Sequence, residues 1–558
     1  MSVQRKTAVS VVLLFLLLWG LSWWLQQSIS IFVGDTGVRF IQIQELIANG
    51  WQTLAINYPG RVFDPDLLYV PYYVAYSVVG NEIFFDITPF MPWLASWGYA
   101  ASGVPGMMLV PVLGGVLTAV AIFRLAQLSQ LPHPHLIMWL TIFATPMFFY
   151  SIELWDHTLA AAVAAWAVYL VAKGFMTRAP AWFVLAGMTV GLGLGQRPEM
   201  YMFAICVGIG VVWVTRWQWR PALLVVVGAL ITAVPIWLWQ YAQVGHPLGM
   251  AMATHLFGYG HPPGEPAVSS NYPWFLRFSR KLFIVEAQAP ITFVSSLAIT
   301  TGLITFILAV RVQKWQRPWV WYSATAIFLT GYVLLIIRVL QPSIAIGVLA
   351  TLPLILLTVM FIDRSVPKQP VRQVYEFVFV VAFSFFMGML LIWPAFGGLQ
   401  WGARYILPFF PLAVYLAFYN YHAWLSIWSD WRGRALRRLL VAVLVVSVLL
   451  QLSGFYFQFS RHQQTGAFRD GVAALAADVV VTNGPYLAVE SASLADIMFF
   501  YVMDSEALQV LIPRFWEAGV TEFAVVPLEL IPLTVPERVG ELEVRQKRPF
   551  VYELSVLE

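Results

Sequence analysis

The sequence predicts a mainly α-helical, polytopic membrane protein with about 13 transmembrane helices. We also expect amphipathic surface helices in the first outer loop and a small C-terminal soluble α/β domain. The composition predicts this class, since 60% of the 558 residues are hydrophobic and only 11% are charged, against about 25% charged in soluble domains. Mean hydropathy is +0.75. In addition, long apolar runs recur before residue 458, and Lys and Arg concentrate in alternate connections between them.

The apolar runs define the expected membrane spans. A spanning helix needs about 20 mostly apolar residues. The candidates are 7–25, 105–123, 136–150, 158–172, 180–196, 199–215, 221–240, 291–310, 319–337, 343–361, 374–393, 405–424 and 439–457. We expect the first run to be retained, because it is long and no small-residue cleavage site is evident. The single cysteine, Cys206, lies in an apolar run, which excludes a disulfide framework and a cysteine-based metal site.

The distribution of Lys and Arg predicts the orientation. With the N-terminus in the cytoplasm, the inner loops hold 17 basic residues and three acids, whereas the outer side up to residue 458 holds eight basic residues and eleven acids. This sorting follows the positive-inside rule and predicts a multi-pass protein of the plasma (inner) membrane. Because the basic residues are sorted by topology, the net charge of +4 does not indicate nucleic-acid binding.

Two domains are expected. Residues 1–459 would form the transmembrane domain, with large outer loops at about 26–104 and 241–290, and residues 460–558 a soluble α/β domain on the outer (periplasmic) side. In the first loop, Leu68–Ile87 is expected to form a hairpin around Gly80-Asn81. The C-terminal strands are expected at 478–482, 523–526, 543–545 and 551–554, and the helices at 468–477 and 505–518. The C-terminal part contains no GxGxxG nucleotide-binding fingerprint.

Asp35 is the first candidate site residue. It lies in the stretch VGDTGVRFIQIQELIANG, residues 33–50, where apolar residues recur at helical spacing. This pattern predicts an amphipathic helix along the membrane surface with Asp35 at its start. Asp35 could cap that helix. It could also serve as a general base or metal ligand in a cleft at the membrane surface, and both roles are compatible.

The second candidate is the outer turn between the third and fourth spans. It contains two aromatics, two acids and a histidine: Tyr150, Trp155, Glu153, Asp156 and His157. A tight turn needs only small polar residues, so this content requires an explanation. The aromatics could lie at the membrane interface, with Asp156 and His157 capping the next helix. Alternatively, Asp156 or Glu153, together with Asp35, holds the acceptor or a divalent cation, since carboxylates suit Mg²⁺ and Mn²⁺.

Two later outer turns carry arginine. Arg197 and Glu199 lie between the fifth and sixth spans with no loop to solvate them, and a self-contained ion pair would explain them. Arg404, followed by Tyr405, lies where the run 405–424 begins. Arg404 could extend toward the membrane surface, or it could bind a phosphate bidentately, which Arg does better than Lys.

These acids and arginines are expected on one face of the membrane, where they could converge on one cleft. Carboxylates and phosphate-binding arginines at an outer membrane surface suit a lipid-phosphate substrate. Transfer of a sugar from such a lipid fits well, because the phosphate leaving group needs charge stabilisation. The acceptor hydroxyl, in turn, needs a base.

In the order of these features the chain resembles the GT-C superfamily of polytopic glycosyltransferases, which includes protein mannosyltransferases and the aminoarabinose transferase for lipid A. The matching motifs are Gly34-Asp35 with the helix ending Ala48-Asn49-Gly50, Glu153-Leu-Trp-Asp156-His157, Arg197-Pro-Glu199 and Trp401-Gly-Ala-Arg404-Tyr405. The resemblance covers about residues 1–420 in architecture. Protein mannosyltransferases often have Asp-Glu at the first motif, whereas Thr36 follows Asp35 here, which puts protein mannosylation in doubt.

The resemblance implies an inverting hexosyl- or pentosyltransferase of cell-envelope glycosylation. The donor would be a polyprenyl-phosphate sugar and the acceptor a glycan, lipid or protein. Asp35 would be the catalytic acidic residue of the first loop, and Glu153, Asp156 and His157 would form the acceptor or second acidic site. Arg404, Arg197 and Tyr405 would bind the donor phosphate, and a divalent cation could lie on Asp35 and Asp156. The C-terminal domain would be accessory.

Two other functions fit the composition less well. A transporter or flippase of a lipid-linked saccharide would need charged residues deep in the spans and an internal repeat. Here the charges cluster at the expected outer ends, and no repeat is evident. A non-catalytic membrane scaffold for the C-terminal domain would not need Asp35, Asp156 and Arg404 together.

Overall fold

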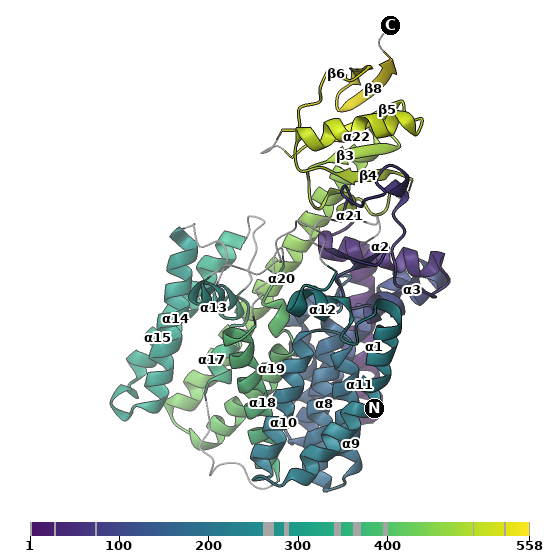
Figure 1. The fold of residues 1–558 in the computed structure, drawn as a ribbon. Helices are drawn as coiled ribbons and strands as arrows, with labels where there is room; N and C mark the ends of the chain where they lie inside the picture. Colours follow the sequence, from purple (N-terminus) through teal and green to yellow (C-terminus); the bar gives the residue numbers. More distant parts are fainter. Residues whose placement is uncertain are drawn as a thin grey trace. The chain divides into compact units, whose positions relative to one another are not determined.

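The computed structural model describes residues 3–26, 30–72, 75–260, 273–283, 290–339, 347–360, 370–393, 400–494, 496–528 and 532–556. The chain forms two compact units (Figure 1). The first unit comprises Met1–Trp23, Met108–Gln240 and Ser269–Phe459. The second comprises Trp24–Met107, Tyr241–Val268 and Ser460–Glu558. Parts of the predicted loop 241–290 and of the candidate span 343–361 lie outside the described residues.

The first unit is helical. Its helices are α1 (Val3–Leu25), α5 (Leu109–Leu128), α6 (Pro134–Phe143), α7 (Met147–Ser151), α8 (His157–Thr177), α9 (Ala181–Leu194), α10 (Glu199–Val214), α11 (Trp219–Val244), α13 (Trp274–Leu282), α14 (Pro290–Arg311), η2 (Gln313–Trp315), α15 (Pro318–Val339), α16 (Val348–Thr351), α17 (Ile355–Thr358), α18 (Val371–Leu391), η3 (Arg404–Ile406), α19 (Phe409–Ile427) and α20 (Trp431–Ala473), of which α1, α11 and α20 extend beyond the unit. In the described part of the chain, eight helices are long and apolar enough to cross a membrane.

Most predicted spans correspond to a helix, but some are short or broken. The span predicted at 136–150 is divided into α6 and α7 at Thr145-Pro146, because proline lacks the N–H that a continuous helix needs. Within 343–361 the described residues form only α16 and α17, of four residues each. The expected total of about 13 spans therefore stays a prediction.

Small residues bring several helices of the first unit close together. A Cβ atom on Gly187 of α9 would lie 2.0 Å from the Val225 carbonyl oxygen of α11, and one on Gly228 would lie 2.1 Å from the Val184 carbonyl oxygen. The two helices thus touch through their backbones. This type of packing is common between membrane helices, where burial of apolar side chains does not by itself drive association.

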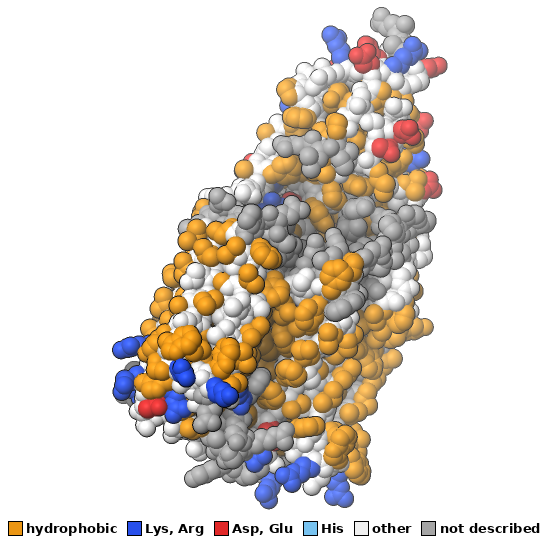
Figure 2. All heavy atoms as spheres, turned by 90° about the vertical axis from the view of Figure 1, so that its left-hand side faces the viewer, with side chains coloured by type: hydrophobic (Ala, Val, Ile, Leu, Met, Phe, Trp, Pro, Cys, Tyr) orange, Lys and Arg blue, Asp and Glu red, His pale blue; other side chains and the backbone are white. Residues whose placement is uncertain are grey.

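The outside of the first unit is apolar. Figure 2 shows apolar side chains over the visible face of this unit, with Lys and Arg gathered at one end. Exposed apolar side chains include Ile304, Trp319, Val441 and Leu449. A surface this apolar suits contact with lipid. With the eight apolar helices, it indicates a multi-pass membrane protein.

The second unit combines the first loop with the C-terminal residues. Its elements are α2 (Gly34–Ala48), η1 (Pro59–Val62), β1 (Tyr76–Val79), β2 (Glu82–Phe85), α3 (Phe90–Ser102), α4 (Val104–Met107), α12 (Gly249–Phe257), β3 (Val479–Thr482), α21 (Leu487–Glu490), β4 (Met498–Tyr501), α22 (Ser505–Glu517), β5 (Glu522–Val526), β6 (Arg538–Val539), β7 (Leu542–Arg548) and β8 (Val551–Val556). The hairpin predicted around Gly80-Asn81 is confirmed, with Val79 opposite Glu82.

The C-terminal strands form one mixed sheet in the order β4-β3-β5-β8-β7-β6. Strand β3 is parallel to β4 and β5, whereas β8 pairs antiparallel with β5 and β7. The four predicted strands and helix α22 are confirmed, and the sequence analysis missed β4 and β6. The predicted helix at 468–477 proves to be the end of α20, which runs without a break for 43 residues.

One face of this sheet shares a hydrophobic core with the first loop. Val479, Val481 and Phe500 of the sheet belong to the same buried cluster as Tyr58 and Phe63 of the loop. The Phe63 ring meets the rings of Phe500 and Phe515 edge-on at 5.6 and 5.8 Å. The backbone joins them as well, since the Tyr501 N–H donates to the Tyr69 carbonyl at 2.9 Å. The first loop and the C-terminal residues therefore pack as one body.

A buried acid, Asp64, shapes the loop side of this core. Its carboxylate accepts hydrogen bonds from the backbone N–H groups of Leu68 (2.8 Å) and Tyr69 (2.7 Å) and from the Tyr58 hydroxyl (3.3 Å). Burial raises the pKa of Asp64, while these hydrogen bonds act in the opposite direction. Asp64 thus has a local structural use that closes the turn after η1.

Candidate active site

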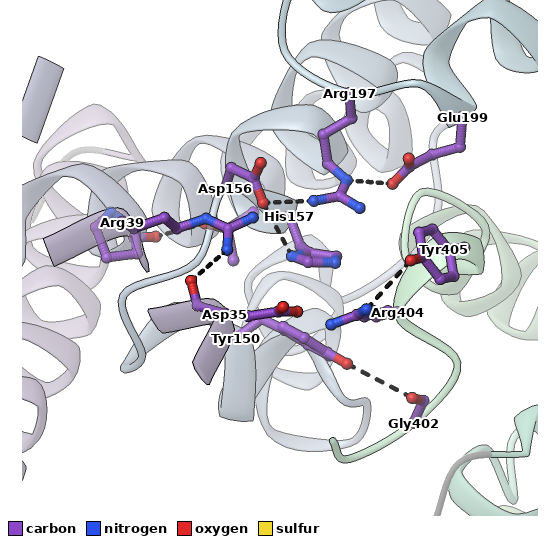
Figure 3. A network of polar contacts seen from close by, with 12 residues as sticks. Asp35, Arg39, Tyr150, Asp156, His157, Arg197, Glu199, Gly402, Arg404 and Tyr405 are labelled. Atoms are coloured by element: carbon purple, nitrogen blue, oxygen red, sulfur yellow. Dashed lines mark hydrogen bonds and ion pairs between the residues drawn. The ribbon is translucent and has the colours of Figure 1, made fainter. Parts of the chain in front are cut away.

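A buried cluster of charged residues joins two turns of the first unit. Arg197 precedes α10, and its Nη1 donates to Oδ1 of Asp156, which precedes α8, at 2.5 Å. The Arg197 Nε also donates to the Glu199 carboxylate. His157 Nδ1 lies 3.2 Å from the same Asp156 oxygen. Figure 3 shows this chain of contacts, in which Arg197 bridges the two acids.

Local sequence explains how the cluster is built. Pro198 takes the N-cap position of α10, so α9 ends at Leu194 and Glu199 begins the new helix. An acid in a first helical turn is stabilised by the helix dipole. Asp156 takes the N-cap position of α8 but makes no side-chain capping hydrogen bond there, because its carboxylate is turned to Arg197. The capping interpretation of the Asp156 side chain is therefore wrong.

The cluster is deeply buried. Asp156, His157 and Glu199 are each 1% exposed and Arg197 is 6% exposed. Buried charges persist in proteins only when they are paired and hydrogen-bonded, because their loss of hydration is expensive. The ion pair that the sequence suggested between Arg197 and Glu199 is present, and Asp156 extends it to a triad that carries more negative than positive charge.

Arg404 and Tyr405 lie beside this triad. Both belong to η3, and the Arg404 Nη2 donates to the Tyr405 hydroxyl at 3.1 Å. The guanidinium carbon of Arg404 lies 5.0 Å from the centre of the Tyr405 ring, and that of Arg197 lies 5.6 Å from the same ring. Two arginines from different turns therefore flank one tyrosine (Figure 3). Cation–π attraction contributes to this placement.

Gly402 allows the chain to reach this position. Its φ is +76°, and a Cβ atom there would lie 2.6 Å from Cγ of Pro146. Both the backbone conformation and the close approach thus favour glycine. The Gly402 carbonyl accepts a long hydrogen bond of 3.5 Å from the Tyr150 hydroxyl, which ties the Arg404 segment to the end of α7.

The aromatic side chains at the turn between α7 and α8 are buried, which corrects the prediction that they lie at the membrane interface. Tyr150 and Trp155 are both 0% exposed. Their rings stack with centroids 5.1 Å apart, and the Tyr150 ring lies 5.0 Å from that of His157. The guanidinium of Arg404 lies 5.9 Å from the Trp155 ring. These side chains form a wall of the charged site instead of a belt at the lipid–water interface.

Glu153, the other acid of the turn, has a different partner. Its Oε2 accepts from Nε2 of Gln458 on α20 at 2.7 Å, and Glu153 is fully buried. The sequence analysis missed Gln458. A signal existed, because Gln451 and Gln458 are spaced by seven residues in an apolar helix and so share one face. Gln451 likewise accepts from the Trp401 indole at 3.0 Å.

Asp35 belongs to the second unit. Val33 is the N-cap of α2, and the Thr36 hydroxyl donates to the Val33 carbonyl at 2.7 Å and accepts from its N–H at 3.1 Å. The expectation that Asp35 caps the helix is therefore wrong, because Thr36 fills that role. That Asp35 faces a cavity with Asp156 or Glu153 stays a prediction.

The helix itself is confirmed, but its expected polar face is not exposed. Arg39 is 4% and Gln42 3% exposed. Arg39 Nη1 donates to the Asp35 carbonyl oxygen at 2.6 Å, and Gln42 donates to the Leu54 carbonyl at 3.3 Å. Backbone carbonyls of the protein thus accept hydrogen bonds from side chains that the helical spacing predicted to face solvent. A location of α2 along the membrane surface stays a prediction.

The carboxylates of the first unit do not suit a metal ion as arranged. In the described ranges, no group of three or more His, Cys, Asp or Glu side chains could hold one. Oδ1 of Asp156 already faces Arg197 and His157, and the positive guanidinium would oppose a cation there. That Asp35 and Asp156 share a cation stays a prediction.

Comparison with known proteins identifies a fold. The sequence matches no protein-family model and no curated protein. Among solved structures, ArnT from Cupriavidus metallidurans in the apo state aligns with a TM-score of 0.50 and 14% identity, over 95% of this chain and 94% of that chain. The same protein bound to undecaprenyl phosphate aligns with a TM-score of 0.48 and 13% identity, over 99% and 98%.

An archaeal structure aligns less closely. Oligosaccharyltransferase AglB from Archaeoglobus fulgidus, in complex with an inhibitory peptide and a dolichol-phosphate, has a TM-score of 0.42 and 11% identity, over 94% of this chain and 70% of that chain. At these identities the likeness is one of fold. This chain therefore has the fold of ArnT over nearly its whole length.

Proposed function

We propose that the protein is a membrane glycosyltransferase that transfers a sugar from a polyprenyl-phosphate donor to an acceptor at the outer face of the membrane. The observation that carries this proposal is the pair of arginines around Tyr405, at 5.0 and 5.6 Å from its ring, beside buried Asp156. The fold supports it, since ArnT is an aminoarabinose transferase of the GT-C class. The sugar would be a hexose or a pentose.

The arginines suit the leaving group of this reaction. A departing lipid phosphate gains negative charge, and guanidinium groups stabilise such charge with paired hydrogen bonds. Arg197 already binds Asp156 and Glu199. We therefore assign the direct phosphate contact to Arg404, with Tyr405 as its hydrogen-bonding partner. Arg197 pairs with both acids and so offsets part of their negative charge beside the phosphate.

The reaction itself is a single displacement. Asp35 takes the proton from the acceptor hydroxyl as that oxygen forms a bond to the anomeric carbon of the sugar. The bond between that carbon and the phosphate oxygen breaks, and its electron pair leaves with the polyprenyl phosphate. Attack opposite the leaving group inverts the anomeric configuration. Asp156 and His157 border the phosphate site, whereas Glu153 contributes to the fold through Gln458.

The orientation follows from the sorting of basic residues. About 13 spans with a cytoplasmic N-terminus would place the first loop and residues 460–558 on the outer side of the plasma (inner) membrane. The acceptor, a glycan, lipid or protein, would then be reached from outside. Digestion of residues 460–558 by protease added to cells stripped of their outer layers is the expected result, and protection would contradict it.

The position of the charges favours catalysis over transport. Asp156, Arg197 and Glu199 lie in turns or at the first residue of a helix. A transport path would place such groups near the middle of the spans. The described helices of the first unit carry this buried cluster only at their ends, which suits a site open to one side.

Donor binding tests the assignment of Arg404. We expect Arg404→Gln to weaken binding of polyprenyl phosphate about 10-fold or more, as removal of a charged hydrogen bond would do. Arg404→Lys should restore part of the affinity. Arg434→Gln, an exposed arginine at the start of α20, is the control and should bind like the wild type. Unchanged affinity in Arg404→Gln would overturn the phosphate assignment.

A further inference from the structure

Residues in the C-terminal part of α20 hold the segment that leads to Asp35. Arg461, on the part of α20 that belongs to the second unit, donates from Nε to the Phe32 carbonyl at 3.2 Å. The next residue, His462, lies with Nδ1 3.0 Å from the Ser30 carbonyl oxygen. Ser30 is 2% and Phe32 0% exposed. The chain thus enters α2 through two backbone contacts with α20.

An ion pair fixes Arg461 in this position. Its Nη2 donates to Oε1 of Glu490, the last residue of α21, at 2.6 Å. Both side chains are largely shielded, with 23% and 12% exposure. Burial raises the pKa of Glu490 and the nearby Arg461 guanidinium opposes that rise. Arg461 therefore links α21 to the residue three positions before Asp35.

Two glycines bring α2 into contact with α21 and its N-cap residue, Tyr486. A Cβ atom on Gly37 would lie 2.0 Å from the Val489 carbonyl oxygen and 2.6 Å from its carbon. One on Gly34 would lie 2.6 Å from Cδ1 of Tyr486. The Gly37 contact is with backbone, which cannot rotate away as a side chain can. Asp35 lies between these two glycines in the sequence. This packing therefore fixes the position of the first turn of α2 along the helix axis and its rotation about that axis, and Asp35 belongs to that turn.

We infer that Arg461, Glu490 and Gly37 are positioning residues for Asp35, so that the C-terminal domain takes part in catalysis by setting the catalytic carboxylate. This inference rests on the proposed function, in which Asp35 accepts the proton. It changes the expected role of the domain, which the sequence analysis considered accessory. Positioning matters because a displacement of about 1 Å of a catalytic group can cost roughly 100-fold in rate.

The first test compares two Gly→Ala variants of the full-length protein. Gly37→Ala should push the first turn of α2 away from Val489 and lower kcat about 10- to 100-fold, with affinity for polyprenyl phosphate unchanged. Gly471→Ala is the matched control, since that glycine also lies in a helix of the same unit and a Cβ atom there would meet nothing within 4 Å. It should keep the wild-type kcat.

The ion pair provides a second, independent test. Arg461→Gln and Glu490→Gln should each lower kcat about 10-fold without weakening donor binding, and the double variant should be little worse than either single one, because both remove the same contact. Arg461→Lys should recover part of the lost rate. If Gly37→Ala fails to fold, the Arg461 and Glu490 variants test the positioning inference in its place. A merely structural role would lower the thermal stability but leave the kcat of the folded fraction and its pH dependence unchanged.

Asp35→Asn separates the two proposals. If Asp35→Asn keeps wild-type turnover, the assignment of the base is wrong and the positioning inference fails with it. If Asp35→Asn is inactive while Gly37→Ala and Arg461→Gln turn over like the wild type, the proposed function stands and only the positioning inference is overturned.

Discussion

The two acidic segments of the molecule are held in different ways. Asp156 is fixed by charge, through an arginine that it shares with Glu199 in a buried triad. The segment of Asp35 is fixed mainly by shape, through Gly34 and Gly37 packed on the backbone and ring of the C-terminal residues. The first arrangement depends on neutralising charges that have lost water. The second depends on a close approach that leaves no room for an added atom at Gly34 or Gly37. The two should therefore respond to different substitutions.

The largest expected effect is on the charged triad. Arg197→Gln would leave Asp156 and Glu199 buried without their cation, which typically costs about 3–5 kcal/mol. Thermal unfolding of the purified protein in detergent would show this as a large loss in Tm. Arg434→Gln removes an exposed arginine and should leave the Tm nearly unchanged. A wild-type Tm in Arg197→Gln would mean that charge pairing does not hold this site.

The second unit should instead respond to loss of packing volume. Phe63→Ala removes a ring that meets Phe500 and Phe515 in the core between the first loop and the sheet. Truncations of this kind cost about 3–5 kcal/mol, toward the lower end where the site can collapse. Limited proteolysis of residues 460–558 in the full chain would measure the loosening. Val62→Ala, at a side chain that is 81% exposed, is the control; equal proteolysis of the two variants would contradict a shared core.

A moderate effect is expected at Glu153. Gln458→Ala removes the amide that donates to the buried carboxylate at 2.7 Å. An unsatisfied buried group costs about 1–3 kcal/mol, with charged groups at the upper end. We expect a smaller loss in Tm than for Arg197→Gln, with donor affinity retained. Gln463 is an exposed glutamine of the same helix, and Gln463→Ala should have the wild-type Tm. Weaker donor binding in Gln458→Ala would instead indicate that Glu153 belongs to the phosphate site.

The smallest effect is expected at the partly exposed ends of strands β5 and β7, where Glu522 meets Lys547 and Arg548. Hydrogen bonds from Lys547 (2.6 Å) and Arg548 (3.0 Å) lower the pKa of Glu522. An acid whose folded pKa is lowered stabilises the protein above its unfolded pKa, near 4.5, and that contribution is lost as the pH falls through the folded pKa. Glu522→Gln should thus lower the free energy of unfolding at pH 7 by no more than about 0.5 kcal/mol, which would appear as a slightly lower Tm.

Salt and acid sharpen that test. Because the pair is exposed, about 1 M salt should abolish the difference between Glu522→Gln and the wild type. At a pH below the folded pKa of Glu522 the two proteins should unfold alike. A difference that grows on acidification would show that Glu522 has the opposite linkage.

The parts of the fold that the sequence predicts are those with local signals. Helix α8 follows a long apolar run, and the β1–β2 hairpin follows a two-residue turn with glycine. Strand β4, Met498–Tyr501, was missed because four apolar residues have no periodicity that separates a strand from a helix. The broken span at Thr145-Pro146 had a local signal in its proline.

Of the contacts in the charged cluster, the sequence predicted only the ion pair between Arg197 and Glu199. Asp156 and Arg197 are 41 residues apart and come from different turns, so no local pattern pairs them. Glu153 and Gln458 are 305 residues apart. The seven-residue spacing of Gln451 and Gln458 marks a polar stripe on α20 but does not name its partner. The burial of Arg39 was also not predicted. The helical spacing placed this side chain in water, whereas in the structure it donates to the Asp35 carbonyl oxygen.

The most direct test of the central claim is sugar release from a panel of radiolabelled polyprenyl-phosphate sugars by the purified protein and by Asp35→Asn, with and without EDTA. We predict turnover of at least one donor by the wild type and a loss of about 100-fold or more in Asp35→Asn, as expected for removal of a general base. Loss of turnover with EDTA would add a divalent cation to the site. Turnover by Asp35→Asn at the wild-type rate would contradict the account.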